Sequence, residues 1–174
     1  DGTLGEGILY ETLNIISKWE LPVLVIIENN HYAQSTSMKS VIAGEIKDRA
    51  KAFNIKYNQS NTWDWKAMSN SFSDSFSYVR NKVKPLILEI ETYRLNAHSK
   101  GDDNRNKSEI EEFNKKDPLN IILNENKKFF AQEENLINKR INDAVSSAQN
   151  DKNCDYNIKH QKMESVIKWQ KSNY

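Results

Sequence analysis

Residues 1–32, DGTLGEGILYETLNIISKWELPVLVIIENNHY, decide the fold of this chain. From about Gly7 to Trp19, apolar side chains recur at the spacing of one helical face, at Leu9, Leu13 and Ile16. The run from Val23 to Ile27 is entirely apolar and mostly β-branched, which is typical of a central parallel strand covered on both faces. The stretch therefore predicts a loop, a helix, a buried strand and a second loop, which is the alternation of an α/β fold.

Two polar residues, Asp1 and Asn30, mark the ends of this unit. Asn30 follows the predicted strand, and Asp1 would follow another strand if one precedes it. Ligands of open α/β sheets bind at that carboxyl edge, and a carboxylate beside an amide oxygen suits Mg²⁺ with phosphate. Gly2 has no Cβ and lets a phosphate approach the backbone, while the next helix directs its positive end to the same place. Asp-Gly and Asn-Asn are also ordinary turn dipeptides, and only their pairing around one helix and one strand favours a ligand site.

The composition argues against several classes of protein. With a net charge of +1 over 174 residues, the chain has no strong field for nucleic acid or an anionic membrane. Trp19, Trp63 and Trp65 stand at the ends of periodic helical segments, so we expect them to pack rather than to bind nucleic acid. The single cysteine, Cys154, excludes an internal disulfide and fits a reducing compartment, and no apolar run could span a bilayer. We expect no nucleic-acid or membrane partner, and a bacterial cytoplasmic or mitochondrial-matrix location rather than secretion.

The rest of the chain continues to alternate helices with strands. Further strands are predicted at about 55–57 and 86–94, and helices at about 45–53, 65–83, 108–115, 119–123, 132–149 and 163–169. The clearest helix places Trp65, Met68, Phe72, Phe76, Val79 and Val83 on one core-facing stripe. A capping box of Ser108 and Glu111 is expected to open the helix at residue 108.

This order predicts an α/β domain over residues 1–123, with helices on both faces of a parallel sheet, followed by a helical extension over residues 124–174. The first residue is Asp, not Met, and it stands where a strand should end. We therefore expect the chain to be the C-terminal portion of a longer protein.

Two segments carry a family resemblance. Asp1-Gly2 and Asn29-Asn30 resemble the thiamine diphosphate fingerprint, in which Gly-Asp-Gly is followed after a βα unit by Asn-Asn. The fuller text to Thr36, together with TYRLNAHSKGDD at residues 92–103, is similar to the alpha subunit of the 2-oxo acid dehydrogenases, which include the pyruvate, branched-chain and acetoin enzymes. The resemblance extends to about Leu123 and departs from the family pattern at Gly5 and Asn96. It implies a partial thiamine diphosphate-binding fold.

The resemblance also implies a set of site residues. Mg²⁺ would be held by Asp1, Asn30 and the backbone carbonyl of Tyr32, and the cofactor thiamine diphosphate would contact Asp1, Gly2, Thr3, Asn30, Arg94 and His98. His98 would be the catalytic residue, transferring a proton or orienting groups during acyl transfer to a lipoyl group. Ser99 stands at a position that regulatory kinases modify in mitochondrial members.

Other polar residues are given no ligand role. We interpret His31 as a neighbour of the metal loop and His160 as a solvated residue of the tail. Asp102 and Asp103 could form a metal-binding pair, but an acidic pair beside a glycine is more often loop solvation.

The function implied by the resemblance is oxidative decarboxylation of a 2-oxo acid, with transfer of the acyl group to a lipoyl domain. For the substrate, the resemblance slightly favours a branched-chain 2-oxo acid, with pyruvate next. The implied partners are a beta subunit in an alpha2-beta2 heterotetramer, the lipoyl domain of the acyltransferase and the 2-oxo acid. The alternatives are another thiamine diphosphate enzyme, of transketolase or decarboxylase type, and a non-catalytic structural subunit with the same fold.

Overall fold

The computed structural model describes residues 1–151, which form two compact units. The first unit covers Asp1–Glu125, and the second begins at Asn126. The predicted helix at 163–169, together with Cys154 and His160, lies outside the described residues.

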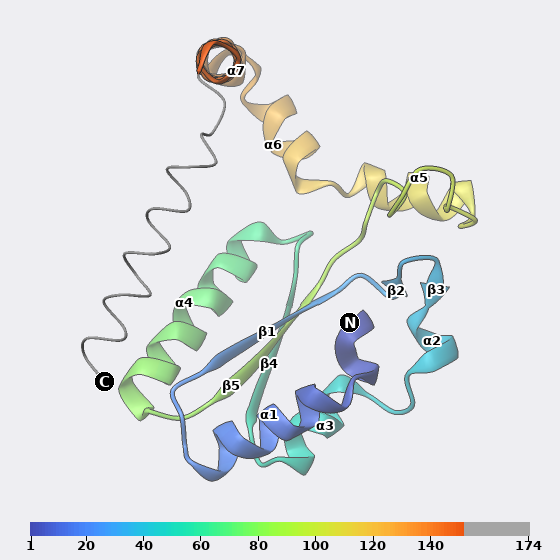
Figure 1. Cartoon of the computed structure of the whole chain (residues 1–174), viewed down its shortest axis with the longest axis vertical. Helices are drawn as coiled ribbons and strands as arrows, with labels where there is room; N and C mark the ends of the chain where they lie inside the picture. The colour runs from blue at the N-terminus through green and yellow to red at the C-terminus, as the bar shows by residue number, and fades with distance from the viewer. Residues whose placement is uncertain (152–174) are drawn as a thin grey trace, which may run out of the picture. The chain divides into compact units, whose positions relative to one another are not determined.

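A parallel three-stranded sheet forms the centre of the first unit (Figure 1). Its strands are β1 (Leu24–Asn29), β4 (Lys56–Asn61) and β5 (Leu86–Glu91), in the order β1-β5-β4. The register pairs both Leu24 and Lys56 with Leu86. All three strands therefore end together, and residues that follow them gather at one edge of the sheet.

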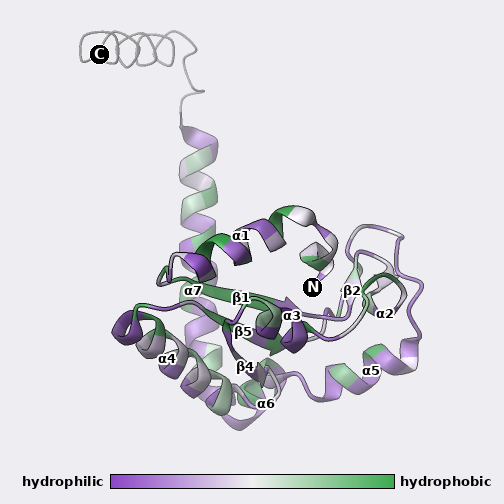
Figure 2. Ribbon diagram, turned by 90° about the horizontal axis from the view of Figure 1, so that it is seen from below, coloured by the Kyte–Doolittle hydropathy of each residue, from purple (hydrophilic) through white to green (hydrophobic). Residues whose placement is uncertain are grey.

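Helices cover both faces of this sheet. On one face α1 (Gly7–Lys18) and α3 (Ile46–Ala52) bury Leu13, Ile16, Ile46 and Ala50 against Ile27 and Ile87. On the other face α4 (Trp65–Lys82) packs Val79, with Met68 and Phe72, against Leu86, Leu88 and Ile90. Figure 2 shows α1 and α4 on opposite sides of the strands. The predicted fold class, a partial thiamine diphosphate-binding α/β fold with a helical C-terminal region, is confirmed.

Within the described residues the first strand is not central, although its residues pack in the clusters on both faces of the sheet. Among the described residues β1 pairs only with β5, so it stands at an edge and leaves Ile26 43% exposed. The central strand is β5, whose residues Leu86 to Ile90 are all buried.

Some expected packing roles are also wrong. Trp19, the residue that follows the last residue of α1, is 68% exposed. On α4 the stripe is only partly core: Trp65, Phe76 and Val83 are exposed, while the positions between them pack on β5.

Several short elements replace predicted loops. They are the 3₁₀ turn η1 (Gly2–Gly5), the antiparallel pair β2 (Tyr32–Ala33) and β3 (Thr36–Ser37), and α2 (Met38–Val41).

The chain after β5 continues into α5 (Lys107–Lys115), α6 (Pro118–Glu125) and, in the second unit, α7 (Lys127–Asn150). The expected capping box is wrong, because the side chain of Asn106 caps α5 by accepting from the Ser108 N–H at 3.0 Å. Among the described helices none has the length and apolar character needed to cross a membrane.

Candidate functional site

A cleft of about 1020 Å³ opens at the carboxyl end of β1. Its walls come from η1, from the turn between β1 and β2, from β1 itself and from the loop that follows β5. The structure brings all the residues named from the sequence into this one cleft: Asp1, Gly2, Thr3, Asn30, Tyr32, Arg94 and His98. The two segments that carry the family resemblance therefore form one site.

Asp1 lies beside the end of β1, where its backbone nitrogen donates to the Glu28 carbonyl at 3.1 Å. Its carboxylate oxygen Oδ2 is buried and has no hydrogen-bond partner among the described residues. An unpaired carboxylate oxygen is expensive to bury, and such atoms in native proteins usually mark an ion or water that completes the site. The oxygen at the cleft is thus of the type that Mg²⁺ binds.

Asn30 sits in a tight turn that its own side chain closes. Its Oδ1 accepts from the Tyr32 N–H at 2.9 Å, and the intervening His31 has a φ of +67°. Oδ1 of an amide has a second lone pair, so this oxygen can also bind a cation. The His31 imidazole Nε2 lies 3.5 Å from Glu91 Oε1.

Asn29, which precedes Asn30, is held by a hydrogen bond to the central strand β5. Its Nδ2 donates to Glu89 Oε1 at 2.8 Å, and its Oδ1 accepts from the His31 N–H at 3.1 Å. The other oxygen of Glu89 accepts from the Tyr57 hydroxyl at 2.6 Å. Burial and this hydrogen bond raise the pKa of Tyr57. Asn29 therefore fixes the turn, whereas Asn30 lines the cleft.

Gly2 lies where η1 passes close to β2. A Cβ on Gly2 would stand 3.0 Å from the Ala33 Cβ, which is tighter than most contacts between two carbons. Packing therefore favours a glycine at this position. Thr3 is exposed and lines the cleft beside it.

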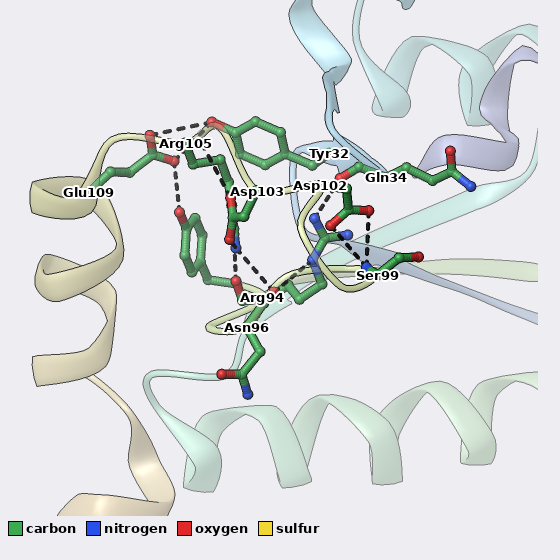
Figure 3. Close-up of polar contacts among 10 residues, drawn as sticks. Tyr32, Gln34, Arg94, Asn96, Ser99, Asp102, Asp103, Arg105 and Glu109 are labelled. Carbon is green, nitrogen blue, oxygen red and sulfur yellow. Dashed lines mark hydrogen bonds and ion pairs between the residues drawn. The ribbon is translucent and has the colours of Figure 1, made fainter.

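The loop after β5 brings Arg94 and His98 to the same cleft. The Arg94 guanidinium donates from Nη2 to the Gln34 carbonyl and from Nε to the Asn96 carbonyl at 3.1 Å (Figure 3). Arg94 therefore joins this loop to the turn after β2. His98 is exposed at the cleft.

Arg105 organises that loop from within. Its side chain is 1% exposed, and it forms a bidentate ion pair with Asp103, at 2.6 Å from Nη2 and 2.8 Å from Nε. It also donates to the carbonyls of Arg94 and Asn96. The hydrogen bonds from Arg105 lower the pKa of Asp103 to about 2.

The interpretation of Asp102 and Asp103 as solvated loop residues leaves out their contacts within the loop. Asp102 accepts from the Ser99 N–H at 2.9 and 3.0 Å and so shapes the turn that carries Ser99. Asp103 holds Arg105 in the loop. Both carboxylates therefore shape the loop, and Asp103 also keeps an exposed surface.

Above the loop, Glu109 in the first turn of α5 accepts from two tyrosine hydroxyls. Tyr32 donates to its Oε1 at 3.0 Å (Figure 3). Tyr93 donates to the same oxygen at 3.0 Å. Burial, followed by the hydrogen bond to Glu109, raises the pKa of Tyr93 to about 12 and also raises that of Tyr32. Glu109 thus joins the start of α5 to the wall of the cleft.

A family model described as "Dehydrogenase E1 component" matches residues 1–157, which is most of the chain. The chain belongs to this family. The alpha-subunit family expected from the sequence is therefore confirmed.

Curated relatives agree with the E1 family assignment. The chain is 39% identical over 125 residues to the pyruvate dehydrogenase E1 component subunit alpha of Rickettsia felis, which covers 70% of this chain and 38% of the relative. The subunit of the same name from Rickettsia bellii is 36% identical over 85% of this chain and 47% of its own length. That of Rhizobium meliloti is 32% identical over 85% and 44%. The chain spans less than half the length of these relatives.

The predicted ligand set of this E1 family chain contains one carboxylate, one amide and one backbone carbonyl. In the described part of the chain no three His, Cys, Asp or Glu side chains gather around a common metal position. The predicted set does not need such a cluster, because Mg²⁺ accepts neutral oxygens together with phosphate and water. The buried, unpaired Asp1 Oδ2 fits the predicted group.

Three supporting residues of the E1 chain were not identified from the sequence: Glu89, Arg105 and Glu109. Arg105 and Glu109 are single charged residues in polar segments, a pattern that usually indicates a solvated surface. Glu89 occupies the polar phase of an alternating strand. The partners of Glu89 and Glu109 come from other segments of the chain, so no local spacing identifies them. Arg105 pairs with the nearby Asp103, but its burial depends on the folded loop.

Proposed function

We propose that this chain is part of the alpha subunit of a thiamine diphosphate-dependent 2-oxo acid dehydrogenase. One observation carries the proposal: the buried, unpaired carboxylate oxygen of Asp1 lies in a cleft that Asn30 and Arg94 also line. A cation held by Asp1 would remove the cost of the unpaired oxygen, and an anion held by that cation would face the Arg94 guanidinium.

In this proposal the residues of the chain bind and orient the cofactor. Asp1, Asn30 and the Tyr32 carbonyl hold Mg²⁺, which neutralises the diphosphate. Gly2 and Thr3 contact the diphosphate, and Arg94, already fixed by Gln34, adds a positive charge. Thiamine diphosphate supplies the carbanion chemistry of decarboxylation, and the protein supplies its position.

His98 has the role of a proton donor or acceptor during acyl transfer to the lipoyl group. It is exposed at the cleft, so a lipoyl group entering from solvent could reach it. Imidazole exchanges a proton near neutral pH, which suits this step.

The proposed partners are a beta subunit, in an alpha2-beta2 assembly, and the lipoyl domain of an acyltransferase. The proposed substrate is a 2-oxo acid. The names of the relatives favour pyruvate, whereas the loop text HSKGDDNR at residues 98–105 favours a branched-chain acid. Measuring the turnover rate of the purified assembly with pyruvate and with a branched-chain 2-oxo acid distinguishes the two substrates. The proposed location is the bacterial cytoplasm or the mitochondrial matrix.

Isothermal titration calorimetry on the complete alpha–beta assembly tests the proposal. Thiamine diphosphate should bind with Mg²⁺ and bind far more weakly without it. Asp1→Ala and Asn30→Ala should each abolish the Mg²⁺-dependent part. Asp48→Ala, an exposed acid on α3 outside the cleft, is the matched control and should bind as wild type does.

The outcome also separates the alternatives. A wild-type assembly that binds no thiamine diphosphate favours a non-catalytic subunit with the same fold. An assembly that binds the cofactor but acts on a sugar phosphate, or releases a free aldehyde without a lipoyl domain, favours the transketolase or decarboxylase type.

A further inference from the structure

Glu109 makes contacts that the proposed chemistry does not use. Its carboxylate lies at the start of α5, and Tyr32 approaches both of its oxygens, at 3.0 and 3.3 Å, while Tyr93 donates to Oε1 at 3.0 Å. Tyr32 begins β2, and Tyr93 follows β5. One side chain thus joins three segments that lie far apart in sequence (Figure 3).

Arg105 occupies the space between these two tyrosines. Its guanidinium carbon lies 5.6 Å from the Tyr32 ring centroid and 5.1 Å from the Tyr93 ring centroid. The Tyr93 ring in turn stacks on Phe113 of α5, with centroids 4.0 Å apart and planes 8° apart. The two hydroxyls are therefore directed to Glu109 by packing as well as by hydrogen bonding, which limits how far Tyr32 can move.

Tyr32 is also joined directly to the turn at Asn30. Its backbone N–H donates to Asn30 Oδ1 at 2.9 Å. The hydroxyl end of Tyr32 is fixed by Glu109, and its backbone end closes the turn that contains a proposed metal ligand. A displacement of Glu109 would therefore move Tyr32, and Tyr32 would in turn move the Asn30 side chain.

We propose that Glu109 is a positioning residue for the metal-binding turn. By holding the Tyr32 hydroxyl, it sets the Tyr32 backbone and the Asn30 side chain in the arrangement that binds the cation. It also makes that arrangement depend on the folded loop at residues 94–106, since Arg105 and Tyr93 belong to the same cluster. This inference rests on the proposed function, because it assigns Glu109 a role toward the same cation.

A purely structural role for Glu109 predicts a different result. A residue that only stabilises the fold would lower the unfolding temperature without changing the cation affinity of the folded protein. A positioning residue changes the affinity and the local opening of the turn. The hydrogen bonds from Tyr32 and Tyr93 to the Glu109 carboxylate are charge-assisted. Their loss should therefore be measurable in the cation affinity and in the local opening of the turn.

The test uses the complete assembly with Glu109→Ala and Tyr32→Phe, and Glu111→Gln as the control. Glu111 is an exposed residue of the same helix. Mn²⁺, in place of Mg²⁺, is titrated at saturating thiamine diphosphate and followed by electron paramagnetic resonance. We expect Glu109→Ala and Tyr32→Phe each to weaken Mn²⁺ binding about tenfold. The double variant should bind Mn²⁺ as tightly as the weaker-binding single variant, because both substitutions remove the same interaction. The control should bind Mn²⁺ as wild type does.

Amide hydrogen exchange without ligand provides an independent readout. Residues 30–34 should exchange faster in Glu109→Ala than in Glu111→Gln. Unchanged exchange there, or wild-type Mn²⁺ affinity in both single variants despite a lower unfolding temperature, overturns the positioning role. A wild-type assembly that binds neither Mn²⁺ nor thiamine diphosphate overturns the proposed function instead, and the exchange comparison still decides whether Glu109 holds the turn.

Discussion

The side-chain amide of Asn29 donates to Glu89 Oε1 at 2.8 Å, from the end of β1 to the central strand β5. Both side chains are buried, and Tyr57 of β4 donates to the second oxygen of Glu89. One carboxylate therefore connects all three strands just below the turn that leads to Asn30.

Replacing Glu89 should destabilise the sheet. In Glu89→Ala the buried donors of Asn29 and Tyr57 lose their acceptor, and we expect a loss of about 2–4 kcal/mol in the free energy of unfolding. Urea denaturation measures this loss. Glu91→Ala, on the same strand but half-exposed and paired with His31, should change the free energy of unfolding by about 1 kcal/mol or less. Equal effects of the two substitutions would refute the structural importance of Glu89.

The close approach of η1 to β2 predicts that a side chain at Gly2 is destabilising. In Gly2→Ala the new Cβ would meet the Ala33 Cβ at 3.0 Å, so we expect destabilisation of about 1–3 kcal/mol and weaker cofactor binding. Gly7→Ala is the matched control, because a Cβ added there would meet no atom of another segment within 4 Å and alanine favours the helix. Thermal unfolding should separate the two variants, and a Gly2→Ala protein as stable as Gly7→Ala contradicts the packing argument.

The ion pair of Asp103 with Arg105 gives stability a specific dependence on pH. The pKa of Asp103 falls from 3.8 to about 2 in the folded protein, so the unfolded state binds the proton more readily. The stabilisation is therefore complete above the unfolded pKa and is lost as the pH falls toward 2.

Asp103→Asn should thus have a lower urea midpoint than wild type at neutral pH. The difference between the two proteins should narrow as the pH falls from about 4 to about 2, the interval between the unfolded and folded pKa values. Asp102→Asn is the control, because Asp102 accepts from the Ser99 N–H and the ion pair with Arg105 is made by Asp103. A difference between wild type and Asp103→Asn that stays constant over this interval would be inconsistent with the shifted pKa.

Removing the His98 imidazole should separate binding from acyl transfer. His98 is exposed and forms no hydrogen bond to another described residue, so His98→Ala should keep the fold and the Mg²⁺-dependent binding of thiamine diphosphate. Acylation of the lipoyl domain should fall by roughly 10²–10⁴-fold, the usual contribution of a general acid or base. The two measurements are calorimetry and lipoyl acylation by the complete assembly, and undiminished acylation would rule out the proposed role.

The sequence predicted those parts of the fold that depend on local periodicity. The helices α1 and α4 and the strands β1 and β5 all follow from apolar spacing. The placement of Asp1 and Asn30 at one site was expected from the carboxyl edge of an α/β sheet, whereas that of Arg94 was implied by the family resemblance. The same spacing could not show that β1 stands at an edge. An apolar run identifies a strand, but its coverage depends on neighbours elsewhere in the chain.

Features that depend on long-range contacts were not predictable. The pair β2–β3 has two residues in each strand, too few to show an alternating pattern. Arg105 is buried in its loop and lies beside the rings of Tyr32 and Tyr93, contacts that its position in a polar segment does not indicate. Glu89 looks like a solvent-facing residue of a strand until Asn29 and Tyr57 are placed beside it.

The order of the sheet has a consequence for how the chain folds. Among the described residues β1 and β4 each pair only with β5, the last of the three strands to be synthesised. During translation the pairings of β1 and β4 with β5 therefore cannot form until residues 86–91 have left the ribosome. Assembly of these three strands is then a late, non-local event, because each ladder joins segments that are distant in sequence.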